Sequence, residues 1–376
     1  MAIQNYQKLE NYYSATGYYL VGDSIYSSKL QALIDGTARN IHPEWVFHQN
    51  IFNNVNWTQS STKSIIELYY NRAREIREKY DYVCILYSGG IDSQNILESF
   101  LNQGLRVDEL VTTWSVQAAE KYAGSINNRS PGNYIAEWTY CIQPYLKLIS
   151  EQHPEIKITV DDSTVHVAKN IYQETDFFMF DHYHNLPGLN RWPPVIKKLE
   201  IMNEQHPNSV TLIGVDKPQL FYNGTQLYLW FIDVTTHIKS TERLNAEYFY
   251  WSPECVELLQ KQCHLIFNFF QQNPQLRNML YKRDDALLQI INLCIYPTYN
   301  PEIFQANKNF LNIFNEQQQW AWKMSQYNDG TYVDRWIGDW RNFLLVIDEK
   351  YKKYTNHLFD GFVGFVTPKY LIGEFR

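Results

Sequence analysis

Apolar and polar residues in the middle of the chain predict helices and buried strands in turn. Segment 63–80, KSIIELYYNRAREIREKY, carries its apolar residues at helical spacing. Segment 81–87, DYVCILY, is a short apolar run without alternation, which is typical of a strand buried on both faces of a parallel sheet. Segment 91–104 predicts the next helix, which ends at Gly104.

The same order continues to about residue 235. Strands are predicted at 107–116, 156–163 and 209–218, and helices at 133–152 and 193–205. Strands that alternate with helices favour an α/β fold built on a doubly wound, mainly parallel sheet. The pair Asn223-Gly224 lies between two apolar runs and predicts a hairpin over 220–230.

The two ends of the chain show a different pattern. Residues 1–62 predict an irregular N-terminal lead-in, with one strand near 18–24. Beyond about residue 250, amphipathic segments predict a mainly helical C-terminal lobe, followed by an irregular tail at 356–376. We therefore expect a lead-in at 1–62, an α/β domain at 63–235, and a C-terminal substrate or lid region at 236–376.

Composition narrows the class of protein. The 376 residues are 45% hydrophobic and 19% charged, which is typical of a globular chain. A net charge of −7 disfavours a broad nucleic-acid or membrane-facing surface. No uncharged apolar run approaches the roughly 18 residues of a membrane span. The five cysteines form no C-x-x-C pair, so we expect a reducing compartment, the cytoplasm.

The strongest chemical signal is SGGIDS at 88–93, between the predicted strand 81–87 and the helix after it. In a parallel sheet the carboxyl ends of the strands form the ligand crevice, and a helix that begins there offers free N–H groups to an anion. The two glycines let the backbone approach a phosphate. Ser88 and Ser93 add hydroxyl donors, and Asp92 can hold Mg²⁺ or cap the helix. The alternative is an ordinary serine- and glycine-rich turn with a capping aspartate.

This segment lacks the Gly-Lys-Ser/Thr of a Walker loop and resembles the S-G-G-x-D-S signature of the PP-loop ATP pyrophosphatase family. All six positions match, namely Ser88, Gly89, Gly90, Ile91, Asp92 and Ser93. The resemblance covers roughly 63–235 and is nearest in type to the synthetase domain of asparagine synthetase-like enzymes. It implies that ATP and Mg²⁺ are the cofactors and that the loop holds the β,γ-pyrophosphate. It also implies that a substrate oxygen attacks the α-phosphate, pyrophosphate leaves, and a nucleophile then displaces AMP.

A second charged group, Asp216-Lys217, follows Gly214 at the end of the strand 209–218. In a doubly wound sheet this strand lies beside the first, and its carboxyl end faces the same crevice. Asp216 would complete the Mg²⁺ site with Asp92, and Lys217 would neutralise phosphate charge, so Asp92 and Lys217 are the candidate catalytic residues. The alternative is a solvated turn. Asparagine synthetases carry a different, G-G-D-E-like element near this point.

The resemblance also implies where adenosine binds, because residues at the ends of the first two strands usually contact it in the family. Tyr87, Trp114 and Ser115 occupy those positions, with Gly214 in the same nucleotide-binding set. Core packing is the alternative for Trp114.

Other positions carry weaker hypotheses, each with a structural or solvated side chain as the alternative. Asp161 and Asp162, at the end of the third strand, could meet an amine or a metal. Segment 239–254 is rich in charge and aromatic residues and could close over the pocket. The candidate metal and anion ligands are His182, His184, Arg191, Lys239 and Arg243.

Residues outside the loop limit the kinds of reaction that the chain could catalyse. Position 2 is Ala2 rather than a glutaminase cysteine, so nitrogen would come from free ammonia, an amine substrate or a separate glutaminase. Cys255 and Cys263 are read as packing residues, which disfavours sulfur transfer. We therefore expect an AMP-forming ligase that adenylates a carboxylate or carbonyl oxygen of a small acceptor. The alternatives are a nucleobase- or tRNA-modifying enzyme and a non-catalytic nucleotide-binding protein. A homo-oligomer is left open.

Overall fold

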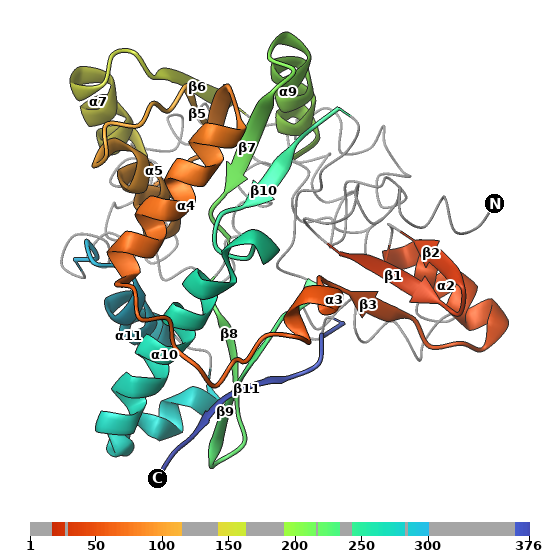
Figure 1. Cartoon of the computed structure of the whole chain (residues 1–376). Coiled ribbons are helices and arrows are strands. Elements are labelled where there is room, and N and C mark those ends of the chain that lie inside the picture. Colours follow the sequence, from red (N-terminus) through yellow and green to blue (C-terminus); the bar gives the residue numbers. More distant parts are fainter. Residues whose placement is uncertain are drawn as a thin grey trace, which may run out of the picture.

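The molecule is built around a parallel sheet of five strands in the spatial order β10-β7-β4-β5-β6 (Figure 1). The computed structural model describes residues 17–26, 29–114, 142–162, 192–215, 217–233, 243–282, 285–300 and 365–376. The strands are β4 Tyr82–Leu86, β5 Glu109–Trp114, β6 Lys157–Asp162, β7 Ser209–Ile213 and β10 Ala246–Tyr248. The winding direction reverses between β4 and β7, which is compatible with a doubly wound fold. The predicted α/β class and parallel sheet are confirmed.

Helix α4 Ile65–Lys79 leads into β4, the first strand of this sheet in the chain. The helices between its later strands are α5 Ile91–Leu101, α7 Gln143–Gln152 and α9 Trp192–Gln205. In Figure 1, α4, α5 and α7 lie to the left of the sheet and α9 to its right. Val83, Cys84 and Ile85 of β4 are fully buried, which explains why this strand shows no polar alternation.

Local sequence signals set the start of α4 and the end of α5. Ser64 caps α4, because its Oγ accepts a hydrogen bond of 3.1 Å from the backbone N–H of Glu67. Helix α5 ends at Leu101, and the turn after it closes at Gly104, whose φ is +67°. The Gly104 N–H donates to Leu101 O at 2.9 Å, and the next N–H, of Leu105, donates to the carbonyl of Phe100 at 3.0 Å. This pair of bonds is a Schellman motif, and the predicted helix end is confirmed.

The N-terminal region is more regular than predicted. Three short strands form an antiparallel sheet in the order β2-β1-β3. The elements are β1 Tyr18–Val21, β2 Ser24–Tyr26, α2 Lys29–Arg39, β3 Glu44–Val46 and α3 Gln49–Phe52. The described residues of this region form regular elements rather than the expected irregular lead-in. The prediction failed because strands this short hardly show alternation of apolar and polar residues. Tyr19 connects this sheet to the rest by donating a buried hydrogen bond of 2.7 Å to Asp233 Oδ2.

The predicted hairpin is confirmed, and a third strand from near the C-terminus pairs with it. Strands β8 Gln219–Tyr222 and β9 Gln226–Trp230 pair antiparallel. The turn between them contains Gly224, with a φ of +106°. Strand β11 Tyr370–Glu374 pairs with β9, so this part of the tail is not irregular as predicted.

The C-terminal region is also less uniformly helical than expected. Strand β10 belongs to the main sheet, although it falls inside the predicted helical region 236–376. With three residues, β10 is too short to be predicted from periodicity. The described helices of this region are η5 Pro253–Cys255, α10 Val256–Gln272, η6 Pro274–Tyr281 and α11 Asp285–Ile295. The helices predicted beyond residue 300 lie outside the described residues.

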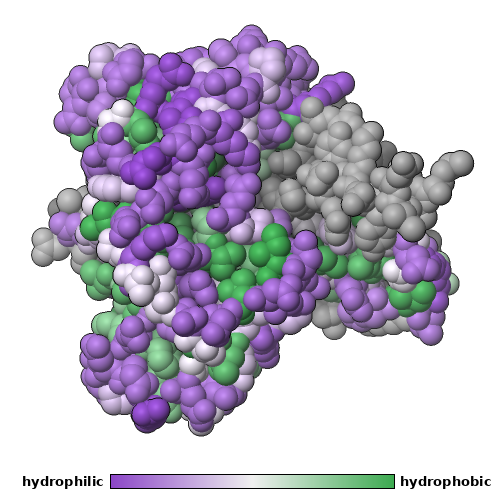
Figure 2. Space-filling view, in the orientation of Figure 1, coloured by the Kyte–Doolittle hydropathy of each residue, from purple (hydrophilic) through white to green (hydrophobic). Residues whose placement is uncertain are grey.

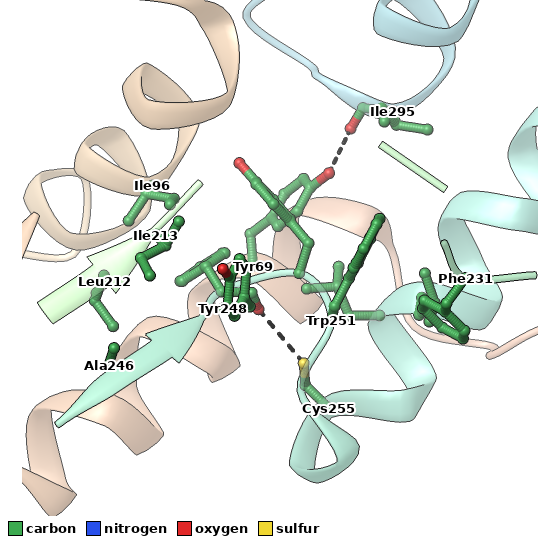
Figure 3. Packing of buried hydrophobic residues seen from close by; sticks show 14 of the residues in the cluster. Tyr69, Ile96, Leu212, Ile213, Phe231, Ala246, Tyr248, Trp251, Cys255 and Ile295 are labelled. Atoms are coloured by element: carbon green, nitrogen blue, oxygen red, sulfur yellow. Dashed lines mark hydrogen bonds between the residues drawn. The ribbon is translucent and has the colours of Figure 1, made fainter. Parts of the chain in front are cut away.

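A single hydrophobic core runs through these parts. Figure 3 shows buried side chains from α4, β7 and the segment before α10 pointing toward one another, among them Tyr69, Ile213 and Trp251. Cys255 and Cys263 are buried in this core, as expected of packing residues.

The surface in the same view is mainly hydrophilic over α4 (Figure 2). Hydrophobic residues show in the middle of this face, between the upper part with α4 and the lower part with β9 and β11. Among the described helices, none has the length and apolar character that crossing a membrane requires.

Candidate functional site

The segments after β4 and β7 meet at the point where the strand order reverses. The two strands are hydrogen-bonded neighbours, with Ile85 opposite Leu212, so their carboxyl ends lie side by side. Gly214 packs against the first turn of α5: a Cβ at this position would lie 3.2 Å from the backbone carbon of Asp92 and 3.2 Å from Ser93 N. A glycine at 214 therefore lets the two strand ends approach each other closely.

The loop after β4 is a tight turn that leads into α5. Gly89 has a φ of +70°, and a Cβ there would lie 2.8 Å from Ile142 Cγ1. Gly90 is extended and is the N-cap residue of α5. Ser93 Oγ accepts a hydrogen bond of 3.2 Å from Ser88 N and donates one of 3.1 Å to Gly90 O. These bonds fix the loop, while the Ser88 side chain is exposed.

Asp92 and Lys217 form an ion pair across the two strand ends. Lys217 Nζ lies 2.9 Å from Asp92 Oδ1 and 2.8 Å from Oδ2. The side chains are 11% exposed for Lys217 and 26% for Asp92. Asp92 is in the first turn of α5, where the helix dipole favours a negative charge. The two candidate catalytic residues are thus brought together, although here the ammonium contacts the carboxylate itself.

Two buried tyrosines complete the surroundings of Asp92. The Tyr296 hydroxyl donates to Asp92 Oδ1, and the Tyr250 hydroxyl donates to the main-chain oxygen of Asp92 at 2.7 Å. Asn95 Nδ2 in turn donates to the Tyr250 hydroxyl at 3.1 Å. Burial, and then the Asp92 carboxylate, raise the pKa of Tyr296 well above its usual value, and burial also raises the pKa of Tyr250. Both phenols therefore stay protonated and act as donors.

A third tyrosine, Tyr69 of α4, packs against these two. Its ring centroid lies 5.9 Å from that of Tyr250 and 6.4 Å from that of Tyr296. The Tyr69 hydroxyl donates to Ile295 O at 2.9 Å (Figure 3) and accepts from Gln262 Nε2 at 3.0 Å. The three rings, which we call the tyrosine cluster, connect α4, α10 and α11 to the first turn of α5.

Sequence reasoning missed Tyr296 because it lies 204 residues after Asp92 and no motif surrounds it. Tyr250 belongs to the segment 239–254 that was expected to close over the pocket. The aromatic run YFYW at 248–251 was the available signal for it.

Of the other predicted nucleotide-binding residues, those that the structure describes lie at the carboxyl ends of the strands, with different surroundings. Tyr87 is buried, and its hydroxyl donates to Gln94 Oε1 at 2.6 Å. Ile91 is buried at the first position of α5. Trp114 is the last residue of β5, next to Asp162 of β6. The side chain of Trp114, and all of Ser115 and Asp216, lie outside the described residues.

Two of the weaker candidates have structural partners or lie far from this edge. Asp161 is buried, accepts a hydrogen bond of 3.2 Å from Thr113 Oγ1 and pairs with Lys198, so it ties β6 to β5 and α9. Arg243 precedes β10 and lies near the start of β7. It is therefore at the amino ends of the strands, away from the loop after β4, and the expectation that it reaches phosphate is wrong. The candidates His182, His184, Arg191 and Lys239 lie outside the described residues.

The Asp92 carboxylate is suited to bind Mg²⁺ provided that Lys217 does not occupy it. Magnesium in nucleotide sites is held by one or two carboxylates together with substrate phosphates, so the single carboxylate beside the loop suffices in principle. In the described part of the chain, no three acidic, histidine or cysteine side chains gather as a metal cluster. Both oxygens of Asp92 contact Lys217, so a cation would fit at this carboxylate only once the ammonium had moved away.

No family model, no curated protein and no solved structure matches this chain. The fold and the site define its class in outline. It is an α/β protein with a five-stranded parallel sheet, in which a glycine loop and an acid–lysine pair meet where the strand order reverses.

Proposed function

We propose that the chain is an ATP-dependent, AMP-forming ligase of the PP-loop ATP pyrophosphatase type. The observation that carries the proposal is the Asp92–Lys217 pair, which joins the glycine loop after β4 to the end of β7. Such a point in an open α/β sheet is where ligands bind.

Each part of the site has a role in this proposal. The first N–H groups of α5 and the hydroxyls of Ser88 and Ser93 bind the β- and γ-phosphates of ATP. Lys217 would leave Asp92 and neutralise charge on the phosphates, and Asp92 would hold Mg²⁺, which would supply further positive charge. Catalysis then rests on positioning and electrostatic stabilisation, which need few reactive side chains.

The acceptor is proposed to be a small molecule with a carboxylate or carbonyl oxygen. That oxygen attacks the α-phosphorus of ATP, the bond to the bridging oxygen breaks, and pyrophosphate leaves with the electron pair. An amine, or ammonia from solution or a separate glutaminase, then displaces AMP from the adenylated acceptor.

The test is to identify the products of ATP. The chain is incubated with ATP, Mg²⁺, ammonia and pooled amino acids, other carboxylic acids and nucleobases, and phosphorus NMR follows the nucleotides. We expect AMP and pyrophosphate in equal amounts, and a loss of about 10²–10³-fold in rate for Asp92→Asn or Lys217→Met. Glu257→Gln, at an exposed ion pair with Lys63, is the matched control and should keep the rate. Formation of ADP and phosphate, or bound ATP that never turns over, would contradict the proposal.

A further inference from the structure

The two oxygens of the Asp92 carboxylate have different neighbours. Oδ1 accepts hydrogen bonds from both Lys217, at 2.9 Å, and Tyr296. Oδ2 accepts from Lys217 at 2.8 Å. If Lys217 leaves, Tyr296 still holds Oδ1, whereas Oδ2 loses this partner.

Tyr296 is well placed to hold its hydroxyl still. The residue is fully enclosed, and its ring packs at a centroid distance of 5.9 Å from Tyr250 and 6.4 Å from Tyr69. A hydrogen bond from such a rigid donor keeps a carboxylate in one orientation.

We infer that Tyr296 is a positioning residue: it anchors Oδ1 of Asp92, and so makes Oδ2 the oxygen that takes the divalent cation when Lys217 moves to the nucleotide. The inference rests on the proposed function, since it assigns a role within that site. It also gives α11 a part in the site, because Tyr296 directly follows that helix.

The test separates metal binding from nucleotide binding. Mn²⁺, which replaces Mg²⁺ and is visible by electron paramagnetic resonance, is titrated into the protein saturated with α,β-methylene-ATP. Binding of the same analogue is measured separately by calorimetry in EDTA. We expect Tyr296→Phe to weaken Mn²⁺ binding about tenfold or more, as loss of a hydrogen bond to a metal ligand does, and to leave analogue binding in EDTA unchanged.

Two further variants show whether the effect is specific. Tyr69→Phe also removes a buried hydroxyl from the tyrosine cluster, but this hydroxyl contacts Ile295 O and Gln262 rather than Asp92. We expect it to lower the melting temperature and to leave Mn²⁺ affinity within twofold of wild type. Lys217→Met should weaken analogue binding in EDTA, the readout that Tyr296→Phe leaves unchanged.

Equal Mn²⁺ affinity in wild type and Tyr296→Phe would overturn the positioning role while leaving the proposed function intact. The positioning role is also overturned if Tyr296→Phe weakens metal and analogue binding together, because that is the result of general loosening. A wild-type protein that binds neither Mn²⁺ nor the analogue would overturn the proposed function and this inference with it.

Discussion

At the scale of single residues, the two loop glycines serve different purposes. Gly89 has a positive φ and lies so close to Ile142 that a side chain would clash with it. Gly90 has an ordinary extended conformation, and a Cβ there would meet Ser88 Oγ at 3.4 Å, a normal contact. The fold therefore requires glycine at 89 but not at 90, where the proposed ATP would approach the backbone.

This difference predicts that alanine destabilises the protein at position 89 but not at position 90. Gly89→Ala should destabilise the protein by about 1–3 kcal/mol, because alanine is strained at this φ and its methyl group meets Ile142. Gly90→Ala should leave the free energy of unfolding within about 0.5 kcal/mol of wild type. Urea unfolding measures both values. Equal destabilisation by the two substitutions would show that the loop conformation is misassigned.

At the scale of elements, a buried arginine joins helix α4 to strand β10. Arg72, 1% exposed, contacts Glu247 of β10 at 2.7 Å and Glu254 of η5 at 3.2 Å. Lys79, in the last turn of α4, also contacts Glu247, at 2.8 Å. Burial alone would raise the pKa of Glu247, but the charge of Arg72 and the hydrogen bonds from Lys79 and Tyr80 outweigh it and lower the pKa.

This cluster predicts a pH dependence of stability. A carboxyl with a lowered pKa in the folded state stabilises the protein above its unfolded pKa, near 4.5, and loses that contribution as the pH falls through the lower folded value. Glu247→Gln should therefore destabilise by about 3 kcal/mol at pH 7, the lower end for breaking a buried pair, since Glu254 still faces Arg72. The difference from wild type should shrink as the pH drops below about 4.

Thermal and urea unfolding between pH 3 and pH 7 measure this effect. Glu257→Gln is the control, because its pair with Lys63 is solvent-exposed and should contribute little to stability. A constant difference between Glu247→Gln and wild type over this range would contradict the role given to Glu247.

The elements that could be predicted are those whose own residues specify them. Strand β4 is apolar because both its faces are covered, and Gly104 closes α5 through its positive φ, so local signals were enough for both. Strand β10 has three residues and exists because it pairs with β7, which no local pattern records. The same distinction separates the site residues that could be predicted from those that could not. The loop and Lys217 carry local sequence signals, whereas Tyr296 reaches Asp92 only through the packing of α11.

At the scale of the whole molecule, residues near the C-terminus complete a sheet that begins just after the site. Strand β8 starts two residues beyond Lys217, and β11 adds to the hairpin partner β9. Ile372 of β11 is buried, and the backbone of Gly373 lies so close to Phe267 of α10 that a Cβ would be 2.7 Å from its ring. The hairpin, α10 and the last strand thus share one packed interior.

This arrangement predicts that the last strand contributes to global stability. Ile372→Ala should destabilise the protein by about 2–5 kcal/mol, because it leaves a cavity in this interior. Leu371→Ala, the neighbouring and half-buried position, should cost about 1 kcal/mol. Urea unfolding of both variants measures the difference. Indistinguishable midpoints for Ile372→Ala and wild type would mean that β11 is not part of the cooperative unit.

The proposed function requires that the loop after β4 binds the phosphates of ATP. The most direct measurement is a calorimetric titration of Mg·ATP into wild type and into Gly90→Ala, the variant expected to keep the fold. We expect one ATP per wild-type chain, and binding at least tenfold weaker in Gly90→Ala because its methyl group occupies the loop. No binding to wild type, or equal affinity in a fully folded Gly90→Ala, would contradict it.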